Sequence, residues 1–356
     1  MIPIAKPLLG KEEKEAVKKV IESGMISQGP KVQEFEEKFA HYLGVKYAIA
    51  TSSGTTALHA ALLANNIKED DEVITMPFTF IATANSILYT GAKPIFADIE
   101  EDSFNIDPDL IEEKINRNTK AIIPVHLYGN PCNMEEIMKI SSNNNLIVIE
   151  DCAHAPGAFI DDKKVGSFST GCFSFYPTKN MTSGFGGMIT TNDALINEKS
   201  RLIRDHGSKT RFHHTILGFN FKMGDINASI GIEQLKKLDN FNKLRRENSL
   251  YLNEKLKNVN WIITPKINKS HVVRQYTIRI KKNRSKIINI LNEKGIGNSI
   301  FYPIPINKQK LYLDLDYKCK LPIAEQLSKE VLSLPIHPDV TKKDLDYIIK
   351  ILKEIK

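Results

Sequence analysis

Residues 47–62 read YAIATSSGTTALHAAL, and this stretch decides the fold class. Its first part, YAIATSS, has the apolar and β-branched character of a short buried strand. Ala57, Leu58, Ala61 and Leu62 then recur with the spacing of one helix face. Because a buried strand that turns directly into a helix is the first half of a strand–helix–strand unit, the stretch predicts an α/β protein.

Six further runs of this kind follow and alternate with helical segments. The run LIVIE, residues 146–150, is apolar on both faces, as expected of a strand that is covered on both sides. Such alternation is typical of a mostly parallel, doubly wound sheet. The predicted seven strands are residues 47–53, 72–77, 93–99, 120–127, 146–152, 172–177 and 187–191.

The chain changes character after about residue 240, where long charged helices begin. We therefore expect a large α/β domain at residues 1–240 and a smaller C-terminal α/β domain at residues 241–356. The large domain opens with two amphipathic helices, at 11–23 and 31–43, each followed by a glycine. In the smaller domain the pattern predicts a strand at 273–280, a helix at 285–294, a strand near 297–302 and two final helices.

Composition bounds the class of protein. Of the 356 residues, 42% are hydrophobic and 26% are charged, which is ordinary for a globular protein. The formal net charge of +7 permits an anionic partner such as a nucleotide or phosphate. The lysines are dispersed, however, and no nucleic-acid-binding module is recognisable, so we expect no nucleic-acid partner.

The cysteines and the apolar runs indicate the cellular compartment in which the protein is expected. None of the four cysteines forms a CxxC pair, which argues against a zinc site or a disulfide framework and favours a reducing compartment. The first residues lack the apolar core of a signal peptide, and no stretch reaches the roughly 18 apolar residues of a membrane span. We expect a cytoplasmic protein without a membrane partner.

Small residues at the end of the first strand suggest an anion site. Gly54 and Thr55 lie where this strand turns into a helix, and the N–H groups at a helix N-terminus attract phosphate. A plain Ser or Thr helix cap is an equally good interpretation of this motif alone.

Two other strand ends carry reactive groups. Asp151 ends an apolar strand, where a carboxylate needs a partner such as a protonated pyridine nitrogen, although a helix cap or a metal ligand would also explain it. Lys179 follows Ser174 beyond another strand end, and a buried lysine becomes a nucleophile because burial lowers its pKa. Most lysines, by contrast, are solvated surface groups.

An aromatic side chain completes the set. Phe80 lies just beyond the strand at 72–77, where it can stack on a planar ring or simply pack in the core. Ligands of open α/β sheets collect at the carboxyl ends of strands. A phosphate site, a stacking ring, a carboxylate and an amine at such ends together match pyridoxal 5'-phosphate.

The ordered motifs then identify a family. The segments SSGTTALHAAL, TFIATANSILYTGAKPIFADI, EDCAHAPGA, CFSFYPTKNMTSGFGGMITTND, GFNFKMGDINASIG and VLSLPIHPD resemble those of DegT-type (DegT/DnrJ/EryC/StrS) nucleotide-sugar aminotransferases, essentially from end to end. The resemblance implies the aspartate-aminotransferase-like (type I) fold and pyridoxal phosphate as cofactor.

The resemblance also assigns roles to single residues. It implies that Lys179 forms the Schiff base with the cofactor and that Asp151 pairs with its ring nitrogen. Asn220, in GFNFK, would reach the cofactor phosphate of a neighbouring subunit, which implies a homodimer with shared active sites. The remaining implied cofactor contacts are His154 at the phenolic oxygen, Phe80 on the ring face, and Gly54, Thr55 and Ser174 at the phosphate.

Three positions depart from the family pattern. Phe185 stands where a glutamate is usual, Lys222 replaces a usual arginine, and Asn307 stands where a histidine is common. None of them has an implied cofactor role, so they affect the substrate assignment more than the reaction.

The implied reaction is transfer of an amino group, from L-glutamate as donor, to a nucleotide-linked keto sugar. The segment KNMTSG, residues 179–184, is closer to family members that act on 4-keto-6-deoxy sugars, such as GDP-perosamine synthase, than to those that act on 3-keto sugars. We therefore expect a 4-keto-6-deoxyhexose as acceptor, with a 3-keto sugar as the alternative.

The sequence disfavours three other functions. A sugar dehydratase of this family carries histidine in place of the lysine, so Lys179 argues against it. A non-catalytic regulator on the same fold is disfavoured by the intact lysine, acid and phosphate motifs. A nicotinamide-binding protein is disfavoured because no GxGxxG follows the first strand.

Overall fold

A computed structural model describes residues 1–281 and 283–355 and shows the predicted seven-stranded sheet. The strand order is β1-β9-β8-β5-β4-β2-β3, and β9 runs antiparallel to both of its neighbours while the other pairs are parallel. The expectation of a mostly parallel sheet is thus confirmed. Its strands are β1 (Tyr47–Thr51), β2 (Glu72–Thr75), β3 (Lys93–Phe96), β4 (Thr119–Ile123), β5 (Ile147–Asp151), β8 (Thr170–Ser174) and β9 (Gly187–Thr191).

Both faces of the sheet are covered, because successive side chains of a strand point to opposite sides. In β9, Met188 joins a core cluster that includes α2 (Pro30–Leu43) and α8 (Asp225–Leu256). The next residue, Ile189, joins a different cluster with α3 (Gly54–Ala64) and α7 (Ala194–Arg204). This double coverage explains why these strands are apolar throughout.

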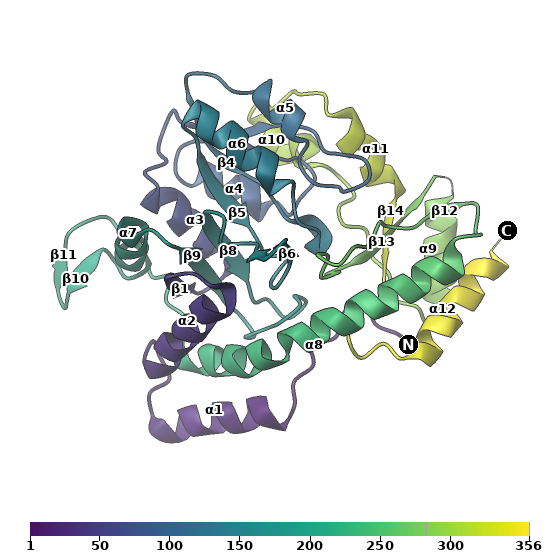
Figure 1. The fold of residues 1–356 in the computed structure, drawn as a ribbon, viewed down its shortest axis with the longest axis horizontal. Helices are drawn as coiled ribbons and strands as arrows, with labels where there is room; N and C mark the ends of the chain where they lie inside the picture. The colour runs from purple at the N-terminus through teal and green to yellow at the C-terminus, as the bar shows by residue number, and fades with distance from the viewer. Residues whose placement is uncertain (282, 356) are drawn as a thin grey trace.

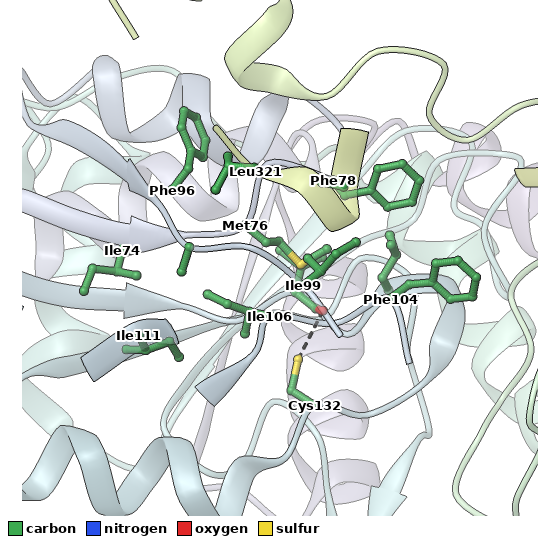
Figure 2. Close-up of a cluster of buried hydrophobic side chains, with 14 of the residues drawn as sticks. Ile74, Met76, Phe78, Phe96, Ile99, Phe104, Ile106, Ile111, Cys132 and Leu321 are labelled. Carbon is green, nitrogen blue, oxygen red and sulfur yellow. Dashed lines mark hydrogen bonds between the residues drawn. The ribbon is translucent and has the colours of Figure 1, made fainter. Parts of the chain in front are cut away.

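A third cluster lies where β2 and β3 continue into their loops (Figure 2). Ile74 and Met76 pack there with Phe96, and Leu321 comes to them from the C-terminal part of the chain. The buried Asp98 accepts hydrogen bonds from the backbone N–H groups of residues 323 and 324, each at 2.9 Å. A carboxylate is stabilised at the N-terminus of a helix, so this contact ties α11 (Pro322–Glu330) to the large sheet.

The remaining helices complete the layers. The two helices expected at 11–23 and 31–43 are present, and they pack against α8 at the edge of the molecule (Figure 1). The first of these two helices is α1 (Lys11–Ser23). The described residues also form α4 (Ala82–Leu88), α5 (Pro108–Glu112), α6 (Met134–Asn144), α9 (Arg284–Glu293), α10 (Lys310–Asp314) and α12 (Lys342–Glu354), with 3₁₀ turns at Leu127–Gly129 and Ile306–Lys308.

The C-terminal part has its own three-stranded antiparallel sheet, ordered β12-β13-β14. Its strands are β12 (Ile262–Ile263), β13 (Tyr276–Ile280) and β14 (Val331–Leu334). Helix α8 runs without a break from the large sheet to this smaller one (Figure 1). The expected boundary at 240/241 lies within α8, and the division into two domains stays a prediction.

One strand was predicted at the wrong place. Residues 297–302 form no strand, and Ser299 alone pairs with Ser333 in an isolated bridge. Pro303 follows directly and has no N–H to donate, so pairing cannot continue there. The apolar run VLSL of β14, directly after α11, supplies the strand instead, although the sequence pattern indicated helices in this region.

Two short hairpins lie outside the main layers: β6 (Phe159–Ile160) with β7 (Lys163–Lys164), and β10 (Ser208–Thr210) with β11 (His213–His214). The second projects away from the body of the molecule beyond α7 (Figure 1). Among the described residues, no helix combines the length and the apolar character that crossing a membrane requires.

Candidate active site

The carboxyl ends of the strands open into one cavity of about 620 Å³. Parallel strands place their carboxyl ends at the same edge of a sheet, so residues far apart in the sequence meet there. Seven of the eight side chains expected from the sequence line this cavity: Gly54, Thr55, Phe80, Asp151, His154, Ser174 and Lys179.

The turn from β1 into α3 forms one end of the cavity. Ser53 caps the helix by accepting a hydrogen bond from the Thr56 backbone N–H at 3.1 Å. The N–H groups of Gly54 and Thr55 belong to the first helical turn, where they have no partner within the helix. A Cβ at Gly54 would lie 2.7 Å from the Ser174 Cβ, so only glycine leaves room at this end. The turn therefore forms a compact anion site.

Asp151 lies at the end of β5, and only 4% of it is exposed. One of its carboxylate oxygens accepts a hydrogen bond from the Thr83 hydroxyl at 2.8 Å, and the other accepts one from the Ala153 N–H at 3.1 Å. Burial raises the pKa of this carboxyl group. A buried carboxylate in this state is stabilised by a cationic partner, such as a protonated ring nitrogen.

Lys179 follows β8 in a turn closed by a hydrogen bond from its backbone N–H to the Tyr176 carbonyl, at 2.9 Å. Desolvation, reinforced by the positive charge of Arg274, lowers the pKa of Lys179 to about 7, while Asp151 acts in the opposite direction. A large fraction of the amine is therefore unprotonated at neutral pH, which is the form that attacks carbonyl carbon.

His154 and Phe80 occupy other parts of the wall. His154 is buried, and its Nδ1 has no hydrogen-bond partner in the part of the chain that the structure describes. Desolvation lowers the pKa of His154 well below its usual value, so the ring is neutral. The Phe80 side chain is 56% exposed, and its ring lies 6.4 Å from the Tyr302 ring. An unpartnered polar atom and an uncovered aromatic face are both suited to a bound planar ligand.

These features fit pyridoxal phosphate. The α3 turn is narrow and suited to an anion. Among the described residues, the buried Asp151 forms no ion pair and His154 Nδ1 has no hydrogen-bond partner. The donor set therefore matches the phosphate, the ring nitrogen and the phenolic oxygen of that cofactor.

Asn220 is the one expected residue that the chain does not bring into this cavity. It is exposed and pairs with Asp205 in an isolated bridge. The next residue, Phe221, accepts a hydrogen bond from the Ser52 N–H at 2.8 Å. The segment therefore lies behind the anion site of its own chain, and the role of Asn220 in a neighbouring subunit stays a prediction.

Several cavity residues were missed by sequence reasoning. Thr83 holds Asp151, while Arg274, Gln275 and Tyr302 line the cavity from the C-terminal part of the chain. The pair Arg-Gln in the apolar run VVRQYTI was a usable signal, because charged residues are costly there without a function.

The three departures from the family pattern have different surroundings. Phe185 lines the cavity and packs edge-on against Tyr176, with ring centroids 5.4 Å apart. Lys222 forms an ion pair with Asp205 at 2.8 Å, and the Asn307 amide donates to the Cys319 carbonyl at 3.0 Å. Of the three, only Phe185 faces the cavity.

A buried group behind the site, His126, Glu150 and Cys152, has the composition of a metal site. His126 Nδ1 accepts a hydrogen bond from the Cys132 N–H at 3.0 Å, so Nε2 carries the proton and faces Glu150 at 3.2 Å. The Glu150 carboxylate also accepts three backbone N–H groups from the 166–169 turn. These hydrogen bonds show that His126 and Glu150 stabilise the end of β5.

Comparisons with known proteins identify the family of the chain. The model of the DegT/DnrJ/EryC1/StrS aminotransferase family matches residues 7–353. A GDP-perosamine synthase of Caulobacter vibrioides is 39% identical, over 99% of this chain and 98% of that protein. A dTDP-3-amino-3,6-dideoxy-alpha-D-galactopyranose transaminase of Aneurinibacillus thermoaerophilus is 40% identical, over 96% and 94%. A pleiotropic regulatory protein of Geobacillus stearothermophilus is 41% identical, over 94% and 92%.

Solved structures share the fold. PseC of Helicobacter pylori, an aminotransferase involved in the biosynthesis of pseudoaminic acid, superposes with a TM-score of 0.94 at 32% identity, over 99% of this chain and 98% of that chain. NtdA of Bacillus subtilis with bound cofactor PMP gives a TM-score of 0.91 at 33% identity, over 97% and 82%. The expected type I aminotransferase fold is confirmed, and the chain belongs to the DegT/DnrJ/EryC1/StrS aminotransferase family.

Proposed function

We propose that the protein uses pyridoxal 5'-phosphate to transfer an amino group from L-glutamate to a nucleotide-linked keto sugar, with a 4-keto-6-deoxyhexose as the acceptor. The observation that carries the proposal is a single cavity that combines the Lys179 amine, the buried Asp151 and the N-terminus of α3. Relatives of about equal similarity are named for amino sugars linked to GDP and dTDP.

The residues of the cavity divide the work of holding the cofactor. The first-turn N–H groups of α3 and the Ser174 hydroxyl would bind the phosphate, and Asp151 would bind the ring nitrogen. His154 would interact with the phenolic oxygen, and Phe80 would pack on the ring. When bound, pyridoxal phosphate supplies an aldehyde that exchanges with amines and a protonated ring that accepts electrons from the donor α-carbon.

Lys179 has two tasks. Its unprotonated Nζ would hold the cofactor covalently, because its pKa of about 7 leaves a nucleophilic amine. After displacement by the donor amine, the same Nζ would move a proton from the donor α-carbon to the aldehyde carbon of the cofactor, and in the second half-reaction from that carbon to the acceptor carbon. The Asp151 carboxylate, held by Thr83 and Ala153, would keep the ring nitrogen protonated.

The proposal that the acceptor sugar carries its keto group at C4 is based on the sequence and on one cavity residue. The segment 179–184 is closer to 4-keto family members, and Phe185 adds an apolar ring beside Tyr176 where a glutamate is usual. An apolar wall suits the 6-deoxy carbon of such a sugar better than a carboxylate would. The similarity to a 3-amino-sugar transaminase keeps the 3-keto alternative open.

We further propose that the enzyme is a homodimer in which Asn220 completes the partner's site. The exposed position of Asn220 outside its own cavity supports this arrangement. Phe212, in the turn of the projecting β10–β11 hairpin, and Leu217, just after the hairpin, are each 83% exposed, and large exposed apolar groups are common at interfaces. The expectation of a cytoplasmic protein remains a prediction.

A substrate panel tests the reaction. The cofactor-loaded protein is incubated with glutamate and with GDP-, UDP- or dTDP-linked 3-keto and 4-keto sugars, with Lys179→Ala as the inactive control. Mass spectrometry detects the amine, and NMR locates it on the sugar ring. We expect an amine at C4. An amine at C3 would favour the 3-keto alternative, loss of water would favour a dehydratase, and no turnover with any pair would contradict the aminotransferase proposal.

A further inference from the structure

Arg274 is a buried cation on the wall of the cavity. Only 7% of the residue is exposed, and its Nε has no hydrogen-bond partner among the residues that the structure describes. Burial lowers its pKa to about 10, so the guanidinium remains charged at neutral pH. Within residues 1–281 and 283–355, no carboxylate forms an ion pair with it. A buried charge of this kind is costly unless a ligand pairs with it.

Hydrogen bonds hold both the backbone N–H and the backbone carbonyl of Arg274. Its N–H donates to the Tyr128 carbonyl at 2.7 Å, and Arg245 donates to its carbonyl at 3.4 Å. Two residues earlier, the Val272 carbonyl accepts a hydrogen bond at 3.0 Å from Asn180, the neighbour of Lys179. Arg274 is therefore tied to the same turn that carries the lysine.

A second arginine strengthens the positive potential at this point. Arg245 is buried on α8, and its pKa is lowered to about 9, first by desolvation and then by Arg274. Its Nε has no partner either. Two buried guanidinium groups, neither paired with a carboxylate among the described residues, favour an anion in the cavity.

The proposed function places the cofactor phosphate at the α3 turn, which leaves the anion beside Arg274 to be supplied by a substrate. Arg274 lines the same cavity as Lys179 and His154, and its segment is hydrogen-bonded to Asn180, the neighbour of the lysine. Arg274 therefore lies in the wall of the space that the reacting amino group must enter. In an α-amino acid, the carboxylate is bonded to the same carbon as that amino group. A planar guanidinium fork matches a carboxylate in two parallel hydrogen bonds.

We propose that Arg274 binds the carboxylate of the amino donor and thereby positions its α-carbon beside Lys179. The inference rests on the proposed function, which it deepens by naming the residue that recognises the donor. The diphosphate of a nucleotide sugar is a less suitable ligand at this place, because the sugar ring separates it from the keto carbon that must reach Lys179.

The experiment distinguishes a role of Arg274 in binding the amino donor from a role in binding the keto sugar. The variants are Arg274→Gln, which removes the charge, Arg274→Lys, which keeps the charge but loses the fork, and the control Arg246→Gln on the outer side of α8. For each cofactor-loaded protein, the glutamate concentration that half-saturates the absorbance change of the cofactor is measured. Calorimetry with glutarate, a dicarboxylate that has no amine and cannot react, gives a readout independent of turnover.

For Arg274→Gln we expect the glutamate requirement to rise, and glutarate affinity to fall, by at least about tenfold, as loss of a hydrogen bond to a charged group implies. Arg274→Lys should lie between this variant and the wild type, and Arg246→Gln should match the wild type. The half-saturating concentration of the keto sugar should change little in all three variants.

Other outcomes would overturn the assignment. Unchanged glutamate and glutarate dependence in both Arg274 variants would show that the residue does not bind the donor. A loss confined to the nucleotide sugar would assign it to the diphosphate instead. If wild-type protein reacted with no amino acid, the proposed function would fail, while glutarate binding would still decide whether Arg274 binds a carboxylate. Thermal unfolding of each variant excludes misfolding as the cause.

Discussion

At the scale of single residues, the two neighbouring acids at the end of β5 show how environment separates structure from chemistry. Glu150 and Asp151 are both buried, and they point to opposite faces of the strand. The Glu150 carboxylate is fully engaged by three backbone N–H groups and His126. Among the described residues, Asp151 has only Thr83 and Ala153 as donors, and it opens to the cavity. Only the second acid is available to a ligand.

The lowered pKa of Lys179 predicts the pH dependence of its reaction with the cofactor. A protonated lysine amine cannot attack a carbonyl, so the reaction is suppressed below the pKa and released as pH rises through it. With a pKa of about 7, the rate at which cofactor-free protein forms the lysine-linked absorbance band should rise with a midpoint near 7. Stopped-flow absorbance across the pH range measures it.

Two controls accompany that measurement. Lys179→Ala should form no such band and should lose turnover, although the remaining wall can still bind the cofactor. A midpoint near 10.5, the ordinary value for lysine, would show that the amine is not desolvated in the cofactor-free protein.

Asp151→Asn should reduce turnover far more than cofactor occupancy. The amide keeps the size of the side chain but removes the negative charge that holds the ring nitrogen protonated. Ser174→Ala is the matched contrast and should mainly weaken cofactor binding, by about 1–3 kcal/mol for a hydrogen bond to a charged group. Equilibrium dialysis gives occupancy and steady-state kinetics give turnover. Near-normal turnover in Asp151→Asn would remove Asp151 from the mechanism.

At the scale of elements, the site depends on strand ends and on one helix N-terminus. Helix α3 begins with Ser53 as its cap, and Gly54 lies against Ser174 of β8. The Ser53 cap and the close approach of Gly54 to Ser174 have different roles. Ser53 satisfies a backbone donor and stabilises the helix, whereas the absent side chain of Gly54 keeps the anion site open.

Gly54→Ala should weaken cofactor binding while the protein remains folded. The added Cβ would lie 2.7 Å from the Ser174 Cβ, so either the β8 end or the α3 turn must shift. Ser53→Ala is the complementary variant and should cost about 1 kcal/mol of folding stability through loss of the cap. Cofactor titration and chemical denaturation of both variants measure the two effects. Unaltered cofactor affinity in Gly54→Ala would mean that the phosphate binds elsewhere.

At the scale of the whole molecule, the cavity is closed by segments that sequence patterns do not bring together. The strand ends carrying Asp151 and Lys179 were predictable, because parallel strands share one carboxyl edge. Arg274 was not, since it precedes β13 of the smaller sheet, and its place at the site depends on contacts with residues 128 and 180. The strand predicted near 297–302 failed for a related reason: only Ser299 finds a partner there, in Ser333, and Pro303 prevents further pairing.

The contribution of Asn220 is likewise a property of the assembly, and a mixed dimer tests it. Asn220 is exposed and outside the cavity of its own chain, so a role at the phosphate requires a second copy. In an isologous dimer, each chain would complete the other's site. We expect Asn220→Ala homodimers to be strongly impaired and Lys179→Ala homodimers to be inactive. A dimer of one chain of each kind then has one site in which Lys179 and Asn220 are both intact.

Activity should therefore return in part when the two inactive proteins are dissociated, mixed and reassembled with cofactor. Differently tagged chains allow the mixed dimer to be isolated, and each parent treated alone serves as the control. If Asn220 acted within its own chain, the only chain with Lys179 would also carry the Asn220 substitution, so activity would stay at the Asn220→Ala level. Failure of verified mixed dimers to exceed that level, or full activity of a stable monomer, would reject shared active sites.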